Sequence, residues 1–212
     1  MLAPWHEGFP GRLAGSVYAA IPESRIDAAQ ALSQAGLDVH VDIMAESEGL
    51  PAGVSISELK QIAETVDPAR IGVHLIGSEN FVDETLPPVL ATGPGVVFLP
   101  WAAFTAERTA AIRAAGAQAW VALWREWDVL DGSPQPDYPA TPDGVLVMLI
   151  EPGTRERSAI GRLAVVTACA GDLPVAVDGG VTESLAELCV TAGANSIVVG
   201  RALLAASEEG TE

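Results

Sequence analysis

Short apolar runs alternate with amphipathic stretches along the chain. In the first amphipathic stretch, Ile26, Ala29 and Leu32 recur at helical spacing, and Gly36 follows where a helix would end. Eight of the apolar runs have the length and composition of buried strands: 13–21, 37–44, 71–76, 96–100, 117–124, 145–150, 174–177 and 197–199. Strands that alternate with helices in this way predict a parallel (β/α)8 barrel, a TIM barrel of the α/β class, with a doubly wound open sheet as the alternative.

Helical segments and loops separate the expected strands. We expect helices at 25–35, 57–66, 80–90, 105–115, 155–170, 182–192 and 202–206. Pro87 and Pro88 should break or bend the third of these, because proline lacks the backbone N–H group and clashes with the preceding turn. Four prolines in 126–143 predict a short helix there at most. The flanks 1–11 and 207–212 are expected to be loose.

Length and charge narrow the possible classes of protein. The 212 residues contain no linker rich in proline, glycine or serine, so we expect a single domain over 1–212. The formal net charge of −17 argues against nucleic acid and anionic membranes as partners, because both would be repelled. We expect no membrane span and no signal peptide. Cys169 and Cys189 should be buried free thiols, which fits a soluble, cytoplasmic protein.

Two histidines and two aspartates are expected to converge at one end of the barrel. His40 and Asp42 are two residues apart in a strand, so both side chains point to the same face, here the barrel interior. His74 lies in the next strand, and Asp178 ends the seventh. Taken alone, each residue is more simply a core histidine or a helix cap. Together, the imidazoles and carboxylates favour a site for one divalent metal ion, such as Zn, Fe, Mn or Co.

Glycines at the ends of the last two strands indicate a phosphate site. Asp178 is followed by Gly179 and Gly180, and the final strand ends in Gly200 and Arg201. A right-handed strand–helix–strand unit brings both carboxyl ends to one face of the barrel. Glycine lets backbone N–H groups approach an anion closely, and a helix N-terminus attracts negative charge. We therefore expect a phosphorylated ligand at this rim, which is its usual place in such barrels.

Several segments resemble ribulose-phosphate 3-epimerases, the metal-dependent (β/α)8 enzymes of the pentose phosphate pathway and the Calvin cycle. The resemblance covers the expected strands 1 to 3 and 6 to 8. Its most specific pieces are His40-Val41-Asp42-Ile43-Met44, Val73-His74-Leu75, Val147-Met148 with Glu151-Pro152-Gly153, and Val177-Asp178-Gly179-Gly180-Val181 with Ala192-Gly193-Ala194-Asn195. The resemblance implies an isomerase whose metal is bound by His40, Asp42, His74 and Asp178. It also implies substrate contacts from Ser16, Met44 and Met148.

The same resemblance implies a reaction: epimerisation of D-ribulose 5-phosphate at C3 to D-xylulose 5-phosphate, through an enediolate. Such a reaction removes a proton beside a carbonyl and returns one to the opposite face, so it needs two acid/base groups. Asp42 and Asp178 would take these roles, and the metal would stabilise the enediolate charge. The partner would be a small phosphorylated sugar.

The segments that follow several strands depart from the family pattern. After the strand 2 methionine the family has Asp-Gly and Phe-Val-Pro-Asn, whereas this chain has Ala45-Glu46-Ser47-Glu48-Gly49. Thr154-Arg155-Glu156-Arg157 replaces a Gly-rich flap, and Trp124-Arg125-Glu126-Trp127 replaces an Asn-Pro segment. A strand 4 histidine is missing from 97–101, and Gly200-Arg201 replaces Gly-Ser.

These departures leave three interpretations open. The first is a pentulose-phosphate epimerase with a rebuilt lid, and the second is an epimerase or isomerase of another phosphosugar. The third is a barrel with weakened catalysis that binds a phosphometabolite. Trp101, Trp124 and Trp127 would line the barrel mouth or form a surface for association into a homo-oligomer.

Overall fold

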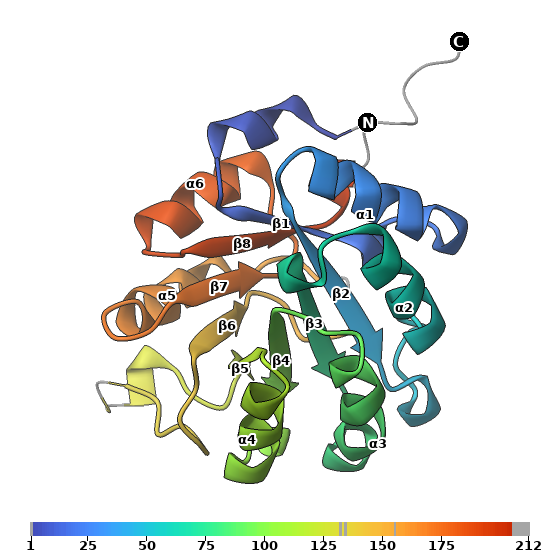
Figure 1. Cartoon of the computed structure of the whole chain (residues 1–212). Coiled ribbons are helices and arrows are strands. Elements are labelled where there is room, and N and C mark those ends of the chain that lie inside the picture. Colours follow the sequence, from blue (N-terminus) through green and yellow to red (C-terminus); the bar gives the residue numbers. More distant parts are fainter. Residues whose placement is uncertain (1, 132, 134, 155, 205–212) are drawn as a thin grey trace.

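The computed structural model of the chain is a closed barrel of parallel strands (Figure 1). The structure describes residues 2–131, 133, 135–154 and 156–204. The strands are β1 (Leu13–Ser16), β2 (Asp38–Met44), β3 (Ile71–Ile76), β4 (Val96–Pro100), β5 (Gln118–Leu123), β6 (Gly144–Met148), β7 (Val175–Asp178) and β8 (Ser196–Val199). Each strand pairs with the next, and β8 pairs with β1, so the sheet has no edge. The predicted single-domain TIM barrel is confirmed, and the open-sheet alternative is wrong.

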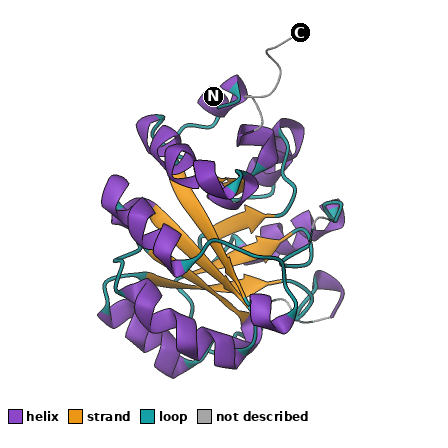
Figure 2. Ribbon diagram, turned by 90° about the vertical axis from the view of Figure 1, so that its right-hand side faces the viewer, coloured by secondary structure: helices purple, strands orange, loops and turns teal. Residues whose placement is uncertain are grey.

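Helices cover the outside of the strands (Figure 2). They are α1 (Arg25–Gln34), α2 (Ile56–Thr65), α3 (Glu79–Leu90), α4 (Ala106–Ala114), α5 (Leu163–Cys169), α6 (Glu183–Thr191) and α7 (Arg201–Leu204). The large core lies between helices and strands, and a smaller apolar cluster that includes Phe98, Trp120 and Met148 fills the barrel interior. Cys169 and Cys189 are free and buried, as expected. Within the described part of the chain, none of the helices is both long and apolar enough to span a bilayer.

Two of the expected elements are shorter in the structure by five residues or more. The first strand stops at Ser16, and Val17–Ala19 forms a 3-10 turn. The helix expected at 155–170 is reduced to a 3-10 turn, Ile160–Arg162, followed by α5. Hydrogen bonds made by 158–159 explain the late start. Ser158 Oγ donates to the carbonyl of Gly179, and Ala159 N donates to the carbonyl of Leu149, so this segment runs along the barrel rim.

Three other expectations can be compared with the structure. Helix α3 runs through Pro87 and Pro88 without interruption. Between 126 and 143 the described residues contain one 3-10 turn, Val129–Asp131, in agreement with the expected short helix. The lead-in is not loose: Pro4–Gly8 is a 3-10 helix, and Trp5 Nε1 donates to the carbonyl of Ala202 at 3.2 Å. The tail 207–212 and the end of the helix expected at 202–206 lie outside the described residues.

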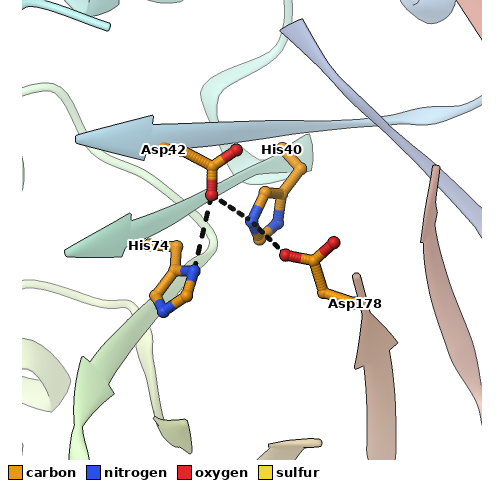
Figure 3. A group of neighbouring side chains, drawn as sticks. All are labelled: His40, Asp42, His74 and Asp178. Carbon is orange, nitrogen blue, oxygen red and sulfur yellow. Dashed lines mark hydrogen bonds and ion pairs between the residues drawn. The ribbon is translucent and has the colours of Figure 1, made fainter. Parts of the chain in front are cut away.

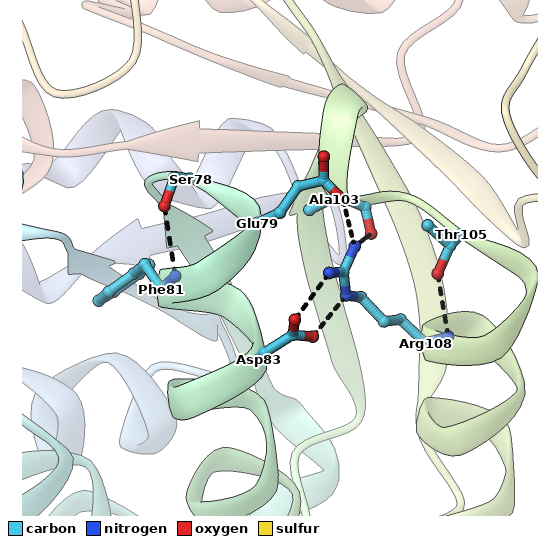
Figure 4. A network of polar contacts seen from close by, with 7 residues as sticks. All are labelled: Ser78, Glu79, Phe81, Asp83, Ala103, Thr105 and Arg108. Carbon is cyan, nitrogen blue, oxygen red and sulfur yellow. Dashed lines mark hydrogen bonds and ion pairs between the residues drawn. The ribbon is translucent and has the colours of Figure 1, made fainter.

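An arginine ties two neighbouring helices together beside the barrel rim (Figure 4). Arg108 of α4 donates to both carboxylate oxygens of Asp83 on α3, at 2.9 and 3.1 Å, and to Glu79 at 3.3 Å. It also donates to the carbonyl of Ala103 at 2.9 Å, just after β4. Because the carboxylates are exposed, each ion pair alone contributes little to stability, but the two-oxygen geometry fixes α3 and α4 relative to β4.

Candidate active site

Strands β2, β3 and β7 bring two histidines and two aspartates together inside the carboxyl end of the barrel (Figure 3). His40 and Asp42 alternate with the outward-facing residues of β2, and Asp42 pairs in register with His74 of β3. Asp178 ends β7 and approaches from the other side. Each residue offers one ligand atom, and these atoms all lie within 4.8 Å of one another. The convergence predicted from strand alternation therefore holds.

Asp42 lies at the centre of this cluster. Its Oδ1 lies 3.2 Å from His40 Nε2 and 3.4 Å from His74 Nδ1. Its Oδ2 accepts a hydrogen bond from Ser16 Oγ at 2.8 Å. On the opposite side, Asp178 Oδ2 lies 4.0 Å from His40 Nε2. Ser16, predicted to contact substrate, thus holds the carboxylate of Asp42 in a fixed orientation.

The chemistry of the cluster fits a metal ion. The Nδ1 atom of His74 is buried and has no hydrogen-bond partner among the described residues, although an unpaired buried nitrogen costs free energy. This nitrogen faces the ligand atoms of the other three residues, and coordination to a metal ion would give it a partner. Two imidazoles and two carboxylates suit Zn, Fe, Mn or Co, as the sequence predicted.

The environment drives the two carboxyl groups to opposite protonation states. Burial, reinforced by the Asp42 carboxylate, raises the pKa of Asp178 to about 6. Burial also opposes ionisation of Asp42, but the neighbouring imidazoles of His40 and His74 outweigh it and hold the pKa of Asp42 far below its usual range. Burial disfavours the charged form of His40, yet the two carboxylates raise its pKa overall. One carboxyl group is therefore held ionised, while the other can accept a proton near neutral pH.

A cavity of about 620 Å3 opens above the cluster. Asp42 and Asp178 line it, together with all the residues predicted to contact substrate: Ser16, Met44, Met148, Gly179, Gly180, Gly200 and Arg201. His40 is buried beneath, with 1% of its surface exposed, and His74 lines an adjoining cavity. The structure thus brings every predicted site residue to one place. Their individual roles stay predictions.

Backbone geometry shapes the end of the cavity expected to bind phosphate. Gly179 and Gly180 have φ of 120° and 65°, in the left-handed region that favours glycine. A Cβ atom on Gly179 would lie 2.7 Å from the Ile150 nitrogen, so only glycine fits this close approach. Thr182 lines the cavity and caps the N-terminus of α6. The exposed side chain of Arg201 adds a positive charge at the same end.

Sequence reasoning missed several residues of the site. Those that also line the large cavity are Tyr18, Ala19, Ile76, Ile150, Gly153, Thr154, Glu156, Val181, Thr182 and Ala202. Most follow the carboxyl end of a strand, so their position in the chain could have identified them, although their residue types could not. Arg155, in the segment that replaces the flap, lies outside the described residues.

Arg162 was also missed, because it falls inside a segment that the pattern assigned to a helix. Its Nε donates to the carbonyl of Met148 at 2.7 Å, and its Nη2 donates to the carbonyl of Leu123 at 3.3 Å. It is 7% exposed. A buried cation that binds the last carbonyls of β5 and β6 fixes that part of the rim, and no local sequence signal marks it.

Solved structures with the same fold include two other barrel enzymes. A mutant tryptophan synthase alpha-subunit from the hyperthermophile Pyrococcus furiosus is 17% identical, with a TM-score of 0.64, over 91% of this chain and 88% of that chain. Phosphoribosyl anthranilate isomerase from Thermococcus kodakaraensis is 15% identical, with a TM-score of 0.59, over 91% of this chain and 89% of that chain. At these identities the similarity shows a shared fold alone. No curated protein matches the sequence significantly.

A family model gives the more specific comparison. The model described as the ribulose-phosphate 3 epimerase family matches residues 12–204. The match runs from the residue before β1 to the last residue of α7, so it includes all eight strands and the whole His–Asp cluster. The chain belongs to the ribulose-phosphate 3-epimerase family.

Proposed function

We propose that the protein is a metal-dependent isomerase that inverts C3 of a ketopentose phosphate and so interconverts D-ribulose 5-phosphate and D-xylulose 5-phosphate. The observation that carries this proposal is the pair of neighbouring carboxyl groups, the buried Asp42 and the half-buried Asp178, whose environments favour opposite protonation states. They lie on β2 and β7, which are separated by β1 and β8 in the closed barrel. Two acid/base groups that approach from different strands suit a reaction on two faces of one carbon.

In the proposed reaction, one carboxylate takes the proton from C3 and the other carboxyl group delivers a proton to the opposite face. The ionised Asp42 is suited to the first step, and Asp178 to the second; the roles exchange in the reverse direction. Ser16 and the imidazoles hold Asp42 in place throughout. The thioethers of Met44 and Met148 line the cavity without offering exchangeable protons.

His40, Asp42, His74 and Asp178 would hold the metal ion. A divalent ion bound there supplies Lewis-acid stabilisation of the negative charge on the enediolate oxygens, which is worth several kcal/mol in general. At the other end of the cavity, the backbone of Gly179, Gly180 and Gly200 and the side chain of Arg201 would bind the phosphate.

The family and the buried free thiols support a place in carbohydrate metabolism, within the pentose phosphate pathway, and a cytoplasmic location. Both statements belong to the proposal. The predicted homo-oligomer stays a prediction.

A second candidate function is epimerisation of another phosphosugar. Thr154 and Glu156 line the cavity from the segment that stands where the family has a Gly-rich flap. A threonine and a carboxylate present different hydrogen-bonding groups from a glycine-rich backbone, so the sugar hydroxyls recognised there would differ.

A coupled assay of D-ribulose 5-phosphate conversion tests the proposal, on protein stripped of metal and then supplied with Zn, Fe(II), Mn or Co. Turnover that requires metal supports the epimerase. Absence of turnover with metal tightly bound would favour the second candidate. If the protein neither binds metal nor turns over the substrate, the proposal fails, and the result favours a barrel that only binds a phosphometabolite.

A further inference from the structure

A second cavity adjoins the candidate active site. Its volume is about 240 Å3, and it lies at the carboxyl ends of β3, β4, β5 and β6. It shares Ile76 and Met148 with the large cavity. His74 lines the second cavity, whereas Asp42 and Asp178 line the first. The His–Asp cluster therefore lies at the border between two compartments.

The two compartments lie at opposite sides of the barrel mouth. The glycine loops after β7 and β8 belong to the large cavity, and in a closed barrel of eight strands β4 and β5 lie across from β8 and β1. A ketose phosphate with its phosphate at those loops and its C3 atom at Asp42 and Asp178 has only C2 and C1 beyond the cluster. In that orientation these atoms would point toward the second cavity.

The walls of the second cavity are mainly apolar. Most of the lining residues are apolar, and they include Pro100, Trp101, Ala122, Trp124 and Pro152. The charged residues are Glu126 and Glu151, and Glu126 Oε2 accepts the Trp124 backbone N–H at 2.7 Å. The lining residues that the structure describes include no lysine or arginine, so an acidic group would have no ion-pair partner in the wall, whereas an uncharged apolar group would bury its surface against apolar side chains.

Arginines hold the Trp124 wall in position. The guanidinium carbons of Arg125 and Arg162 lie 4.9 and 5.0 Å from the centre of the Trp124 ring. Arg162 is itself fixed by its bonds to the carbonyls of Met148 and Leu123. The cavity is thus built by a supported side chain, and its shape does not depend on a single exposed loop.

The size of the cavity exceeds what a pentulose needs. Beyond the C2 carbonyl, D-ribulose 5-phosphate has a single hydroxymethyl group. The cavity of about 240 Å3 is much larger than such a group, since one water molecule occupies about 30 Å3 in the liquid. We propose that the second cavity is a substrate subsite for an uncharged, largely apolar extension on C1 of a ketose 5-phosphate. This inference rests on the orientation given by the proposed function.

Calorimetric binding to the metal-loaded protein tests the subsite, with D-ribulose 5-phosphate, its 1-O-benzyl ether and its 1-O-carboxymethyl ether as probes. The benzyl ether should bind at least about tenfold tighter than D-ribulose 5-phosphate, because its ring would bury apolar surface in the cavity. The carboxymethyl ether should bind no tighter than D-ribulose 5-phosphate. Benzyl binding that is no tighter than that of D-ribulose 5-phosphate overturns the proposal.

A filling variant gives the matched test. Ala122→Leu adds bulk inside the second cavity, and Ala110→Leu makes the same change on the exposed face of α4. The ratio of benzyl ether affinity to D-ribulose 5-phosphate affinity should fall at least about tenfold in the first variant and stay constant in the second. Trp101→Ala removes a side chain from the wall of the second cavity and should also lower this ratio. It replaces Ala122→Leu as the test if that variant does not fold. An unchanged ratio in the folded variant overturns the proposal.

The turnover assay separates this inference from the proposed function. If the benzyl ether binds tighter and Ala122→Leu loses this preference, but D-ribulose 5-phosphate is not turned over, the subsite is supported and the proposed epimerase function fails. Turnover without benzyl preference overturns the subsite alone.

Discussion

The two sides of the barrel mouth differ in their chemistry. The side formed by β7, β8, β1 and β2 carries glycine loops, a serine and both carboxylates of the cluster. The side formed by β3 to β6 carries Trp101 and Trp124 around a smaller, more apolar cavity. The comparison teaches that both acid/base carboxyl groups lie on strands of the first side, while His74 on β3 is the member of the cluster that faces the second. Loops on the second side can therefore change without moving the two carboxyl groups.

The two sides are also held in different ways. The cluster depends on strand alternation and register, which place His40, Asp42 and His74 without help from loops. The other side depends on contacts between side chains, such as that of Arg162 with Trp124. Substitutions within the cluster, including His74 on β3, should therefore affect metal binding and chemistry, and those in the walls of the second cavity should affect which ligand binds.

The largest effect is expected from the two carboxyl groups. Asp42→Asn and Asp178→Asn should each lower the epimerisation rate by about 10²- to 10⁴-fold, because each removes an acid/base group. The coupled assay measures this rate, and circular dichroism confirms the fold. Asp27→Asn, on the exposed face of α1, is the matched control and should retain activity. Activity within a few-fold of wild type in either site variant would contradict the mechanism with two carboxylates.

A metal-content measurement extends the comparison to the imidazoles. Loss of a residue that only hydrogen-bonds to a metal ligand typically weakens metal binding roughly 10- to 100-fold. His74→Ala should weaken it by more than this, because it removes a ligand itself. Elemental analysis after dialysis would show the loss. His6→Ala, outside the cluster, should keep the wild-type content. Equal metal content in the two variants would exclude His74 as a ligand.

The pH dependence of metal affinity should reflect the raised pKa of Asp178. Below about 6, this carboxyl group holds a proton in the metal-free protein, and that proton competes with the metal ion for the carboxylate oxygens. Metal affinity should therefore fall as the pH drops through that value, by about tenfold per pH unit for each proton displaced. Titrations with zinc at several pH values measure this slope. Asp178→Asn should make it shallower without abolishing it, because His40, whose pKa is also raised, still binds a competing proton. A wild-type affinity independent of pH would contradict the expectation.

The smallest effect is expected at the phosphate end. Arg201→Ser should raise KM for D-ribulose 5-phosphate by about two- to fivefold with little change in kcat, because the exposed guanidinium contributes only modest charge attraction. Lys60→Ser removes the same charge from the exposed face of α2 and should leave KM unchanged. If both variants give the wild-type KM, Arg201 does not contact the phosphate.

The fold and the cluster could be predicted because both follow from simple periodicities. Alternation along β2 was enough to orient His40 and Asp42, and the ends of parallel strands bring His74 and Asp178 to the same rim. The end of β1 could not be predicted, because 13–21 is apolar almost throughout and no polar residue marks the 3-10 turn after Ser16.

Other features depended on solvent exposure or on contacts between residues that are distant in sequence. Pro87 and Pro88 are tolerated in the last turns of α3, where Asp83 and Glu84 are exposed and water can satisfy the carbonyls that lose a partner. The second cavity and the buried Arg162 arise from residues of several strands, so no segment of the chain predicts them alone.

The exchange of the C3 proton tests the central claim most directly. Metal-loaded protein would be incubated with D-ribulose 5-phosphate in D2O, and proton NMR would follow the C3 position. We expect D-xylulose 5-phosphate that carries deuterium at C3, and loss of this conversion in Asp178→Asn. A metal-loaded protein that neither exchanges the C3 proton nor forms D-xylulose 5-phosphate would contradict the account.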